Sequence, residues 1–216
     1  MSIIEIVSLA IILLISIWLH EYAHAYVSYR LWDPTPKLQW RLTSNPLKHM
    51  DPIWFFMIFL IGFWWGKPVQ VNPTYYKDPL KWELMVALAW PATNLILSTI
   101  GIILLLIFSK IFSLWINDIF LNNANALIMF FVNFSMINIL LAVFNLIPLP
   151  PLDGFRIVKM ISYNFASFVE KYTTYISIMF LILILWPGRS VVWNFLRTVS
   201  NSIFQFIFTI FATIFY

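Results

Sequence analysis

The sequence predicts an all-α polytopic membrane protein with about five to six membrane segments, including a re-entrant segment and a short strand-like element. Of its 216 residues, 62% are hydrophobic and only 10% are charged. That balance is typical of chains that cross a bilayer several times. Five apolar stretches are evident and a shorter sixth ends the sequence: roughly 3–29, 52–66, 82–109, 125–147, 172–187 and 202–216. The polar segments between them are too short for a large soluble domain, so we expect a single domain over 1–216.

The individual stretches differ in length and in breaks. Residues 3–29 exceed the roughly 20 that a spanning helix needs, and they lack the charged start and cleavage site of a signal peptide. Residues 52–66 are fewer and contain Gly62, so we expect them to be re-entrant. Residues 67–73 (KPVQVNP) alternate like a strand, and their two prolines restrict it to an edge. Residues 202–216 either span, together with the few residues before them, or lie in the interface.

Charge and cysteine content exclude several classes. The formal net charge is +4, but no basic cluster forms, so we expect contact with a lipid bilayer rather than with nucleic acid. The chain has no cysteine, which excludes both disulfides and thiolate metal ligands.

One motif in the first apolar stretch carries chemistry. Residues 20–24 read HEYAH, an H-E-x-x-H pattern. Side chains four apart lie on one helix face, so His20 and His24 can bind one Zn²⁺. Glu21 is then placed to act as general base toward a zinc-bound water. Because ionisable groups are costly in hydrocarbon, their presence here points to function.

A catalytic zinc usually takes three protein ligands, so the two histidines need a partner. Asp153 follows three prolines that break the helix expected over 125–147, where unwound backbone can bring a side chain to membrane depth. Alternatively, Asp153 caps the helix after Gly154. His49, in a polar loop, is a rival ligand, and a gluzincin-like site would use Glu83 or Glu170 instead.

Five segments together resemble the site-2 protease family of intramembrane zinc metalloproteases. They are HEYAH, NPLKHMDP (45–52), KPVQVNP (67–73), WPATN (90–94) and NLIPLPPLDG (145–154), and they occur in the family's order. The likeness is to the short subgroup without a PDZ or CBS domain. It implies a protease that hydrolyses peptide bonds in or near transmembrane segments of membrane proteins. The catalytic core would cover about 1–160, and C-terminal membrane segments about 170–216.

The resemblance also implies roles for residues. His20, His24 and Asp153 match the ligands of one zinc ion, and Glu21 matches the catalytic base. Asn94 and Asn145 match asparagines that hold the substrate backbone or stabilise the oxyanion. Trp90 departs from the pattern, because the family has a glycine there and close helix packing is expected.

Charge distribution predicts the orientation. His20 and Asp153 can share a metal only if 52–66 does not cross the membrane once. Ten of the thirteen Lys and Arg residues then face one side, which is cytoplasmic by the positive-inside rule: Arg30, Lys37, Arg41, Lys48, Lys67, Lys77, Lys81, Arg156, Lys159 and Lys171. We therefore expect a multi-pass protein of the cell membrane whose active site opens toward the cytoplasm.

Two other classes of function fit less well. A polar-lined transporter or channel would need ionisable groups on several helices, whereas 82–109 carries only Glu83 near its end. A catalytically inert metal-binding scaffold would be expected to have lost part of the motif, and every motif residue is present.

Overall fold

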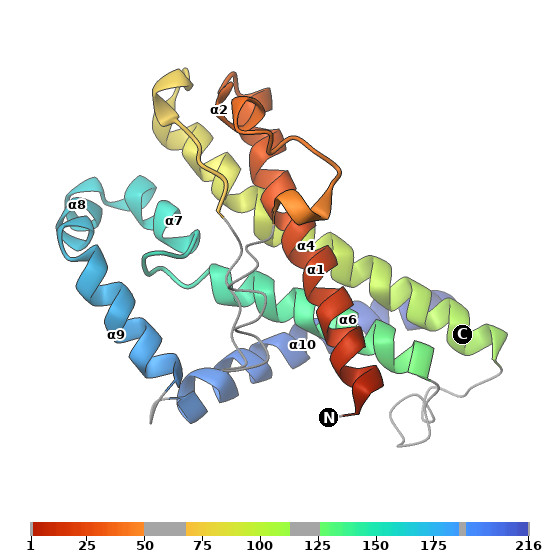
Figure 1. Cartoon of the computed structure of the whole chain (residues 1–216). Helices are drawn as coiled ribbons and strands as arrows, with labels where there is room; N and C mark the ends of the chain where they lie inside the picture. The colour runs from red at the N-terminus through yellow and green to blue at the C-terminus, as the bar shows by residue number, and fades with distance from the viewer. Residues whose placement is uncertain (1, 50–67, 113–125, 186–188, 216) are drawn as a thin grey trace. The chain divides into compact units, whose positions relative to one another are not determined.

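The computed structural model describes residues 2–49, 68–112, 126–185 and 189–215, and over these ranges the chain is helical, without a strand (Figure 1). The helices in chain order are α1 (Ile3–Arg30), α2 (Thr35–Leu38), η1 (Pro46–Lys48), η2 (Pro73–Tyr75), α4 (Pro79–Ile111), α6 (Ala126–Asn145), α7 (Gly154–Ile161), α8 (Tyr163–Lys171), α9 (Thr173–Leu185) and α10 (Arg189–Phe215). The predicted all-α class is confirmed.

Four of these helices, α1, α4, α6 and α10, are long and apolar enough to cross a membrane. The pair α8 and α9 meets at a bend of 78° and would count as a fifth span if it crosses as one broken unit. The predicted re-entrant segment 52–66 lies outside the described residues. Residues 202–215 of the final stretch belong to the much longer helix α10 (Arg189–Phe215), so the length of the stretch no longer argues against spanning.

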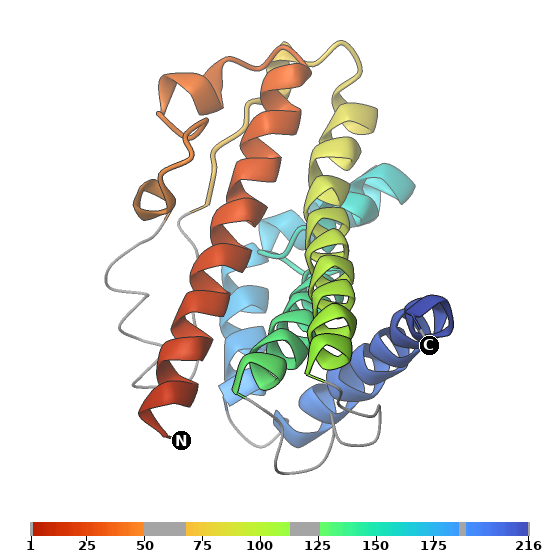
Figure 2. The ribbon, with the colours of Figure 1, turned by 90° about the vertical axis from the view of Figure 1, so that its right-hand side faces the viewer.

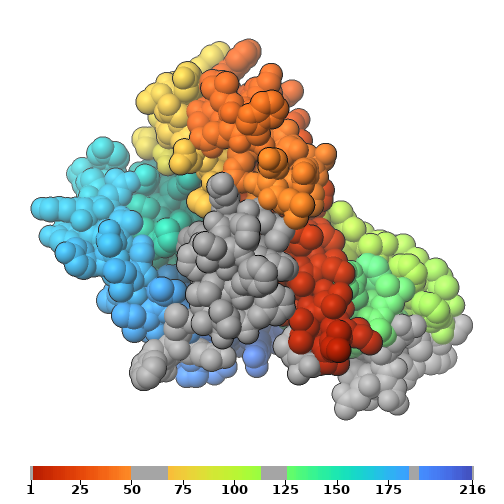
Figure 3. Space-filling model, viewed as in Figure 1, coloured from red at the N-terminus to blue at the C-terminus, as the bar shows by residue number. Residues whose placement is uncertain are grey.

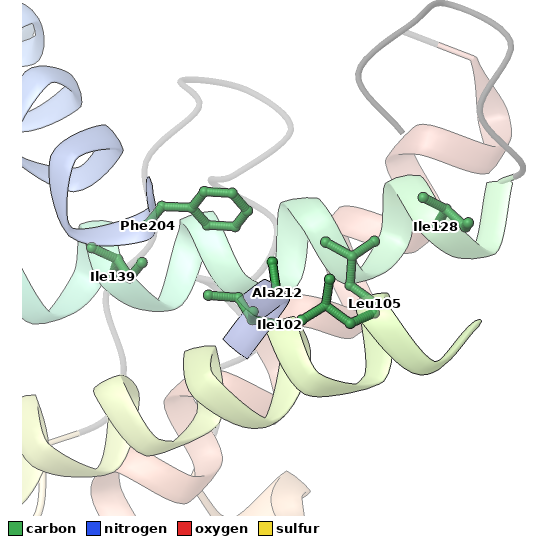
Figure 4. Close-up of a cluster of buried hydrophobic side chains, with 7 residues drawn as sticks. Ile102, Leu105, Ile128, Ile139, Phe204 and Ala212 are labelled. Atoms are coloured by element: carbon green, nitrogen blue, oxygen red, sulfur yellow. The ribbon is translucent and has the colours of Figure 1, made fainter. Parts of the chain in front are cut away.

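The structure divides into two compact units, which we describe separately. The first contains Met1–Ile12, Asn94–Phe144 and Phe180–Tyr216. Its core consists of aliphatic and aromatic side chains from the later half of α4, from α6 and from α10, six of which are labelled in Figure 4. Within this unit α4 and α6 approach closely, since a Cβ at Gly101 would lie 2.4 Å from Ser135 Oγ. A larger residue at position 101 would require Ser135 and Phe134 to shift, so glycine suits this helix crossing.

The second unit contains Leu13–Thr93 and Asn145–Met179. In it the later part of α1 lies beside the first part of α4 (Figure 2). The short helices α7 and α8 pack on each other through Phe155, Ala166 and Val169. All residues of the HEYAH motif and Asp153 belong to this unit.

The end of α1 is fixed by its backbone. Trp32 adopts a left-handed conformation (φ 72°), and the amide of Asp33 donates to the carbonyl of Ser28 at 3.1 Å. This is the pattern of a Schellman helix end, which glycine usually provides, and a tryptophan there costs about 1–2 kcal/mol. The turn carries Asp33 back toward Ser28, whose hydroxyl donates to the Asp33 carboxylate at 2.7 Å.

Asp33 connects the end of α1 to the segment before α4. Its carboxylate also accepts hydrogen bonds from the amides of Thr35 (2.9 Å) and Asn72 (2.8 Å), and Tyr76 contacts Ser28 at 2.7 Å. The surfaces of 33–49 (orange) and 68–78 (yellow) adjoin in Figure 3. No strand is assigned to 68–72, although Asn72 is extended (φ −119°, ψ 100°). The predicted strand-like element is thus an extended segment held by side chains.

Candidate active site

Helix α1 brings the motif side chains together inside the second unit. His20, Glu21 and His24 are 9%, 6% and 7% exposed, although each is polar or ionisable. Their spacing puts both imidazoles on one face of an uninterrupted helix. Buried polar groups of this kind need partners, so the surroundings of each ring decide what the cluster can do.

Asp153 reaches the same cluster from a distant part of the chain. It precedes α7 at the N-cap position, but its side chain makes no capping hydrogen bond. Instead Oδ2 lies 3.0 Å from His24 Nε2. The fold-back depends on Gly154, where a Cβ would lie 2.4 Å from the carbonyl oxygen of Leu146. Asp153 therefore occupies the N-cap position, while its carboxylate faces the histidines instead of capping the helix.

The donor atoms fit a zinc ion. One ligand atom from each of His20, His24 and Asp153 lies within 4.8 Å of the others. Bonds of about 2.0–2.2 Å in a tetrahedral site place ligand atoms roughly 3.3 Å apart, so small side-chain adjustments suffice. The carbonyl of Val86 can only accept, so His24 Nδ1, 2.9 Å away, carries a proton there. Such a bond to the second ring nitrogen is the usual way to orient a histidine ligand.

The charge state of Asp153 also suits metal binding. Burial alone raises the pKa of this carboxyl, but the charge and hydrogen bond of His24 and the charge of Arg156 outweigh it. The pKa of Asp153 therefore lies below its ordinary value, which favours the ionised form that a metal ligand needs.

Glu21 is held between the cluster and the segment before α4. One carboxylate oxygen lies 3.4 Å from His20 Nε2, and the other accepts a hydrogen bond from the backbone amide of Val69 at 2.8 Å. Val69 is in turn placed by Arg41, whose buried guanidinium donates to the carbonyls of Lys48 (2.7 Å) and Pro68 (3.3 Å). This leaves one oxygen of Glu21 directed to the cluster.

Trp90 covers His20. Its ring centroid lies 3.6 Å from that of His20 at an interplanar angle of 67°, and 6.4 Å from that of His24. The side chain is only 2% exposed. The sequence flagged Trp90 as a bulky replacement that disturbs packing; in the structure the indole fills space directly beside a predicted ligand.

The remaining candidates lie elsewhere. His49 is fully buried, and its Nε2 lies 3.2 Å from the carbonyl of Thr43, outside the metal-ligand cluster. Glu83 pairs with Arg156 and Lys159, and Glu170 pairs with Lys159, so neither joins the histidines. These contacts do not support the alternative ligand sets.

The two predicted asparagines differ in setting. Asn145 is the last residue of α6, half-buried and in the same unit as the cluster. Asn94 belongs to the other unit and is fully buried, and its amide atoms have no hydrogen-bond partner among the described residues. Their predicted contact with substrate stays a prediction.

Three residues that contribute to the site were not predicted from the sequence: Val69, Arg41 and Arg156. Val69 contributes a backbone amide, which leaves no side-chain signature. Arg41 sits in a polar loop like several other basic residues, and only its burial distinguishes it. Arg156 follows Gly154 by two residues, and in the sequence it counts only as one of the basic residues that predict the orientation.

Comparisons with known proteins identify the family. Residues 108–185 match the family model described as Peptidase family M50. A Bacillus subtilis (strain 168) protein named "Putative zinc metalloprotease YwhC" is 37% identical over 205 residues, covering 94% of this chain and 92% of the relative. A Mycolicibacterium smegmatis protein named "Putative zinc metalloprotease Rip2" is 30% identical over 147 residues, covering 66% of this chain and 52% of the relative. No solved structure matches.

The long match covers nearly the whole of both chains, and it includes the motif helix and the Asp153 turn. The M50 family model, the zinc metalloprotease relatives and the His20, His24 and Asp153 cluster agree with one another. The chain therefore belongs to peptidase family M50, the site-2 protease family, and is a zinc-dependent metalloprotease.

Proposed function

We propose that this metalloprotease works inside the membrane and hydrolyses peptide bonds in or near transmembrane segments of other membrane proteins. The observation that carries the proposal is the place of the cluster. Two histidines and a glutamate are buried in the later half of α1, a 28-residue helix that is apolar enough to span. A protease acting on soluble chains has no need to place ionisable groups there.

His20, His24 and Asp153 hold the zinc ion in this proposal. When bound, zinc polarises the scissile carbonyl and lowers the pKa of a coordinated water toward about 7. With three protein ligands, one position stays open for the reacting groups. The bond from His24 Nδ1 to the Val86 carbonyl keeps the other ring nitrogen directed at the ion.

Glu21 moves the protons. The oxygen beside His20 accepts the proton of the attacking water and later donates it to the leaving amine. The Val69 amide holds the second oxygen, so the carboxylate cannot rotate away from the cluster. Asn145 and Asn94 hold the substrate backbone or stabilise the developing oxyanion. The substrate must unwind before this chemistry, because a helix satisfies its own carbonyl groups.

The site opens toward the cytoplasm, and the protein is a multi-pass protein of the cell membrane. Ten of thirteen Lys and Arg residues fall on the side where 30–81 and 148–171 emerge, which the positive-inside rule assigns to the cytoplasm. Water reaches the zinc from that side. The partners are the lipid bilayer and a transmembrane protein substrate.

The test is Glu21→Gln assayed on a model single-span substrate in detergent or liposomes. Glutamine cannot accept the proton but leaves the ligand set untouched, so cleavage falls at least about 100-fold while zinc content is unchanged. Glu5→Gln is the matched control, since Glu5 lies at the exposed start of the same helix, bonded to Ser2. Near-normal turnover by Glu21→Gln would remove Glu21 from the role of general base.

A further inference from the structure

A metal centre is fixed by the groups that hold its ligands as well as by the ligands. A ligand histidine normally donates a hydrogen bond from the N–H of its second ring nitrogen to an acceptor. Loss of such partners commonly weakens metal binding 10–100-fold. For His24 that acceptor is the carbonyl of Val86, on α4. The question is what holds His20 and Asp153.

His20 has a different kind of partner. Its Nδ1 has no hydrogen-bond partner within the described part of the chain. The ring is packed instead against the indole of Trp90, also on α4, at a centroid distance of 3.6 Å and 67°. Both residues are buried, Trp90 almost completely. The indole of Trp90, packed this closely, leaves the imidazole of His20 little freedom to rotate away from the cluster.

Asp153 is held by charge. While Oδ2 faces His24, Oδ1 lies 3.5 Å from Nε of Arg156. The guanidinium of Arg156 lies 3.8 Å from a carboxylate oxygen of Glu83, again on α4. Arg156 thus bridges a metal ligand and a fixed carboxylate, and all three side chains are at least partly buried, where charges are screened less by solvent.

The three supports share one helix. Glu83, Val86 and Trp90 are spaced by three and four residues, so they follow one face of α4. We propose that this face is the outer frame of the metal centre: Trp90 positions His20, Val86 positions His24, and Glu83 positions Asp153 through Arg156. The proposal rests on the ligand set given under Proposed function. It also assigns a purpose to the tryptophan that stands where a glycine was expected.

The competing explanation is that Trp90 is ordinary core packing and that Arg156 and Glu83 form an ion pair with little effect. The two explanations differ in whether changes at Trp90 and Arg156 alter zinc affinity and ligand geometry. We would therefore measure zinc affinity by competition with a chelator. The visible absorption of the cobalt(II)-substituted protein would report ligand geometry independently of activity.

Trp90→Leu and Arg156→Gln are each expected to weaken zinc binding about 10–100-fold and to alter the cobalt spectrum. Trp90→Phe and Arg156→Lys, which keep an aromatic ring and a positive charge, should recover most of the affinity. Glu83→Gln should weaken binding less, and should have no further effect once Arg156 is glutamine, because it acts through that residue.

Two controls are matched in residue type and lie away from the ligands. Trp82→Leu removes a tryptophan of the same helix whose ring faces Tyr76, and Glu5→Gln removes an exposed carboxylate at the start of α1 that is bonded to Ser2. Both should bind zinc as the unaltered protein does. His24→Ala tests the ligand set itself and should lose the metal.

The outcomes separate the two proposals. If His24→Ala loses zinc while Trp90→Leu and Arg156→Gln keep both affinity and the cobalt spectrum, the outer frame is wrong and the ligand set stands. If His24→Ala retains zinc, the ligand set itself is wrong. If Trp90→Leu fails to fold, the variants Glu83→Gln and Arg156→Gln, alone and combined, still test the proposal. Independent, additive effects of these two changes on zinc affinity would overturn it.

Discussion

Asp153 stands where sequence reasoning allowed two alternative functions, a metal ligand or a helix cap. It starts α7 at the N-cap position, yet its carboxylate is directed to His24 and Arg156 rather than to the free amides of the helix. A capping side chain typically contributes about 1 kcal/mol. The structure forgoes that contribution, which is understandable if the carboxylate is needed for the metal.

This leads to a prediction about metal content. Asp153→Ala should lower zinc occupancy and activity together, because it removes one of three ligands. His49→Ala should leave zinc in place, since His49 contacts the carbonyl of Thr43 and lies outside the cluster. Metal analysis of the two purified variants checks this. Zinc lost from the His49 variant and kept in the Asp153 variant would make His49 the third ligand.

The residue scale also shows where sequence reasoning reaches its limit. His20, Glu21 and His24 could be found because their geometry follows from helix periodicity alone. For Asp153 the sequence left two roles open, a metal ligand or a helix cap. The choice between them depends on long-range folding. The amide of Val69 and the burial of Arg41 depend entirely on tertiary contacts, so no local pattern marks them.

At the scale of elements, the turn that ends α1 helps to fix the segment that binds Glu21, the predicted general base. Asp33 ties the turn after α1 to the amides of Thr35 and Asn72 and to the hydroxyl of Ser28. The Asn72 bond fixes the extended segment only three residues beyond Val69, whose amide binds Glu21. A carboxylate outside the membrane-spanning part of the helix thus stabilises the surroundings of the active site.

Asp33 should make stability depend on pH. Burial raises its pKa, but the hydrogen bonds from Thr35, Asn72 and Ser28 outweigh burial, so the pKa lies below the usual value. The ionised group therefore stabilises the fold above its unfolded pKa of about 4, and this contribution is lost as the pH falls through the lower, folded pKa. Asp33→Asn should cost about 1–3 kcal/mol at pH 7 and progressively less in acid.

Thermal unfolding in detergent at neutral and acidic pH measures this difference. Glu170→Gln, which removes a half-exposed carboxylate, serves as the control and should change stability little. A deficit of the Asp33 variant that stays constant down to acidic pH would show that the carboxylate's charge is not what stabilises the turn.

The extended segment 68–72 also has a predicted part in substrate binding. We expect it to pair with an unwound substrate by adding an edge strand. Val69 is buried between the exposed Pro68 and Gln70, whereas Val71 and Asn72 are both half-buried. Val71→Pro should weaken cleavage of stable substrate helices more than of unstable ones, because the proline removes a backbone donor.

A matched substrate series tests this together with substrate unwinding. Adding a Gly or Pro near the cut site destabilises the substrate helix by roughly 1 or 3 kcal/mol relative to Ala and should speed cleavage. Val71→Ala, which keeps the backbone amide, is the control enzyme. Equal rates across the series would mean that unwinding is not limiting, and a Val71→Pro enzyme with an unchanged pattern would exclude strand addition.

At the scale of the whole molecule, hydropathy predicts the spanning helices well where the stretch is long and continuous. α1, α4 and α6 follow the predicted stretches closely, because a membrane-length apolar run has few alternatives to a helix. The stretch 172–187 agrees with α9 (Thr173–Leu185) over the described residues, whereas the last stretch was less accurate, because α10 begins well before it, at Arg189. Polar helical residues carry no hydropathy signal, so this boundary depends on tertiary structure.

The orientation of the chain yields the last prediction. A shared zinc site requires α1 and the Asp153 turn to meet at the same membrane face, so the segment 52–66 must enter and leave on one side. Single cysteines at Lys48 and Lys77 are informative, because the chain has no native cysteine and both positions are exposed. Both should resist a membrane-impermeant maleimide added to intact cells and react in inverted vesicles. A cysteine at the exposed Lys110 should behave in the opposite way. Labelling of Lys48 and Lys77 from opposite sides would mean that 52–66 crosses the membrane, and His20 and Asp153 would then be delivered to different faces.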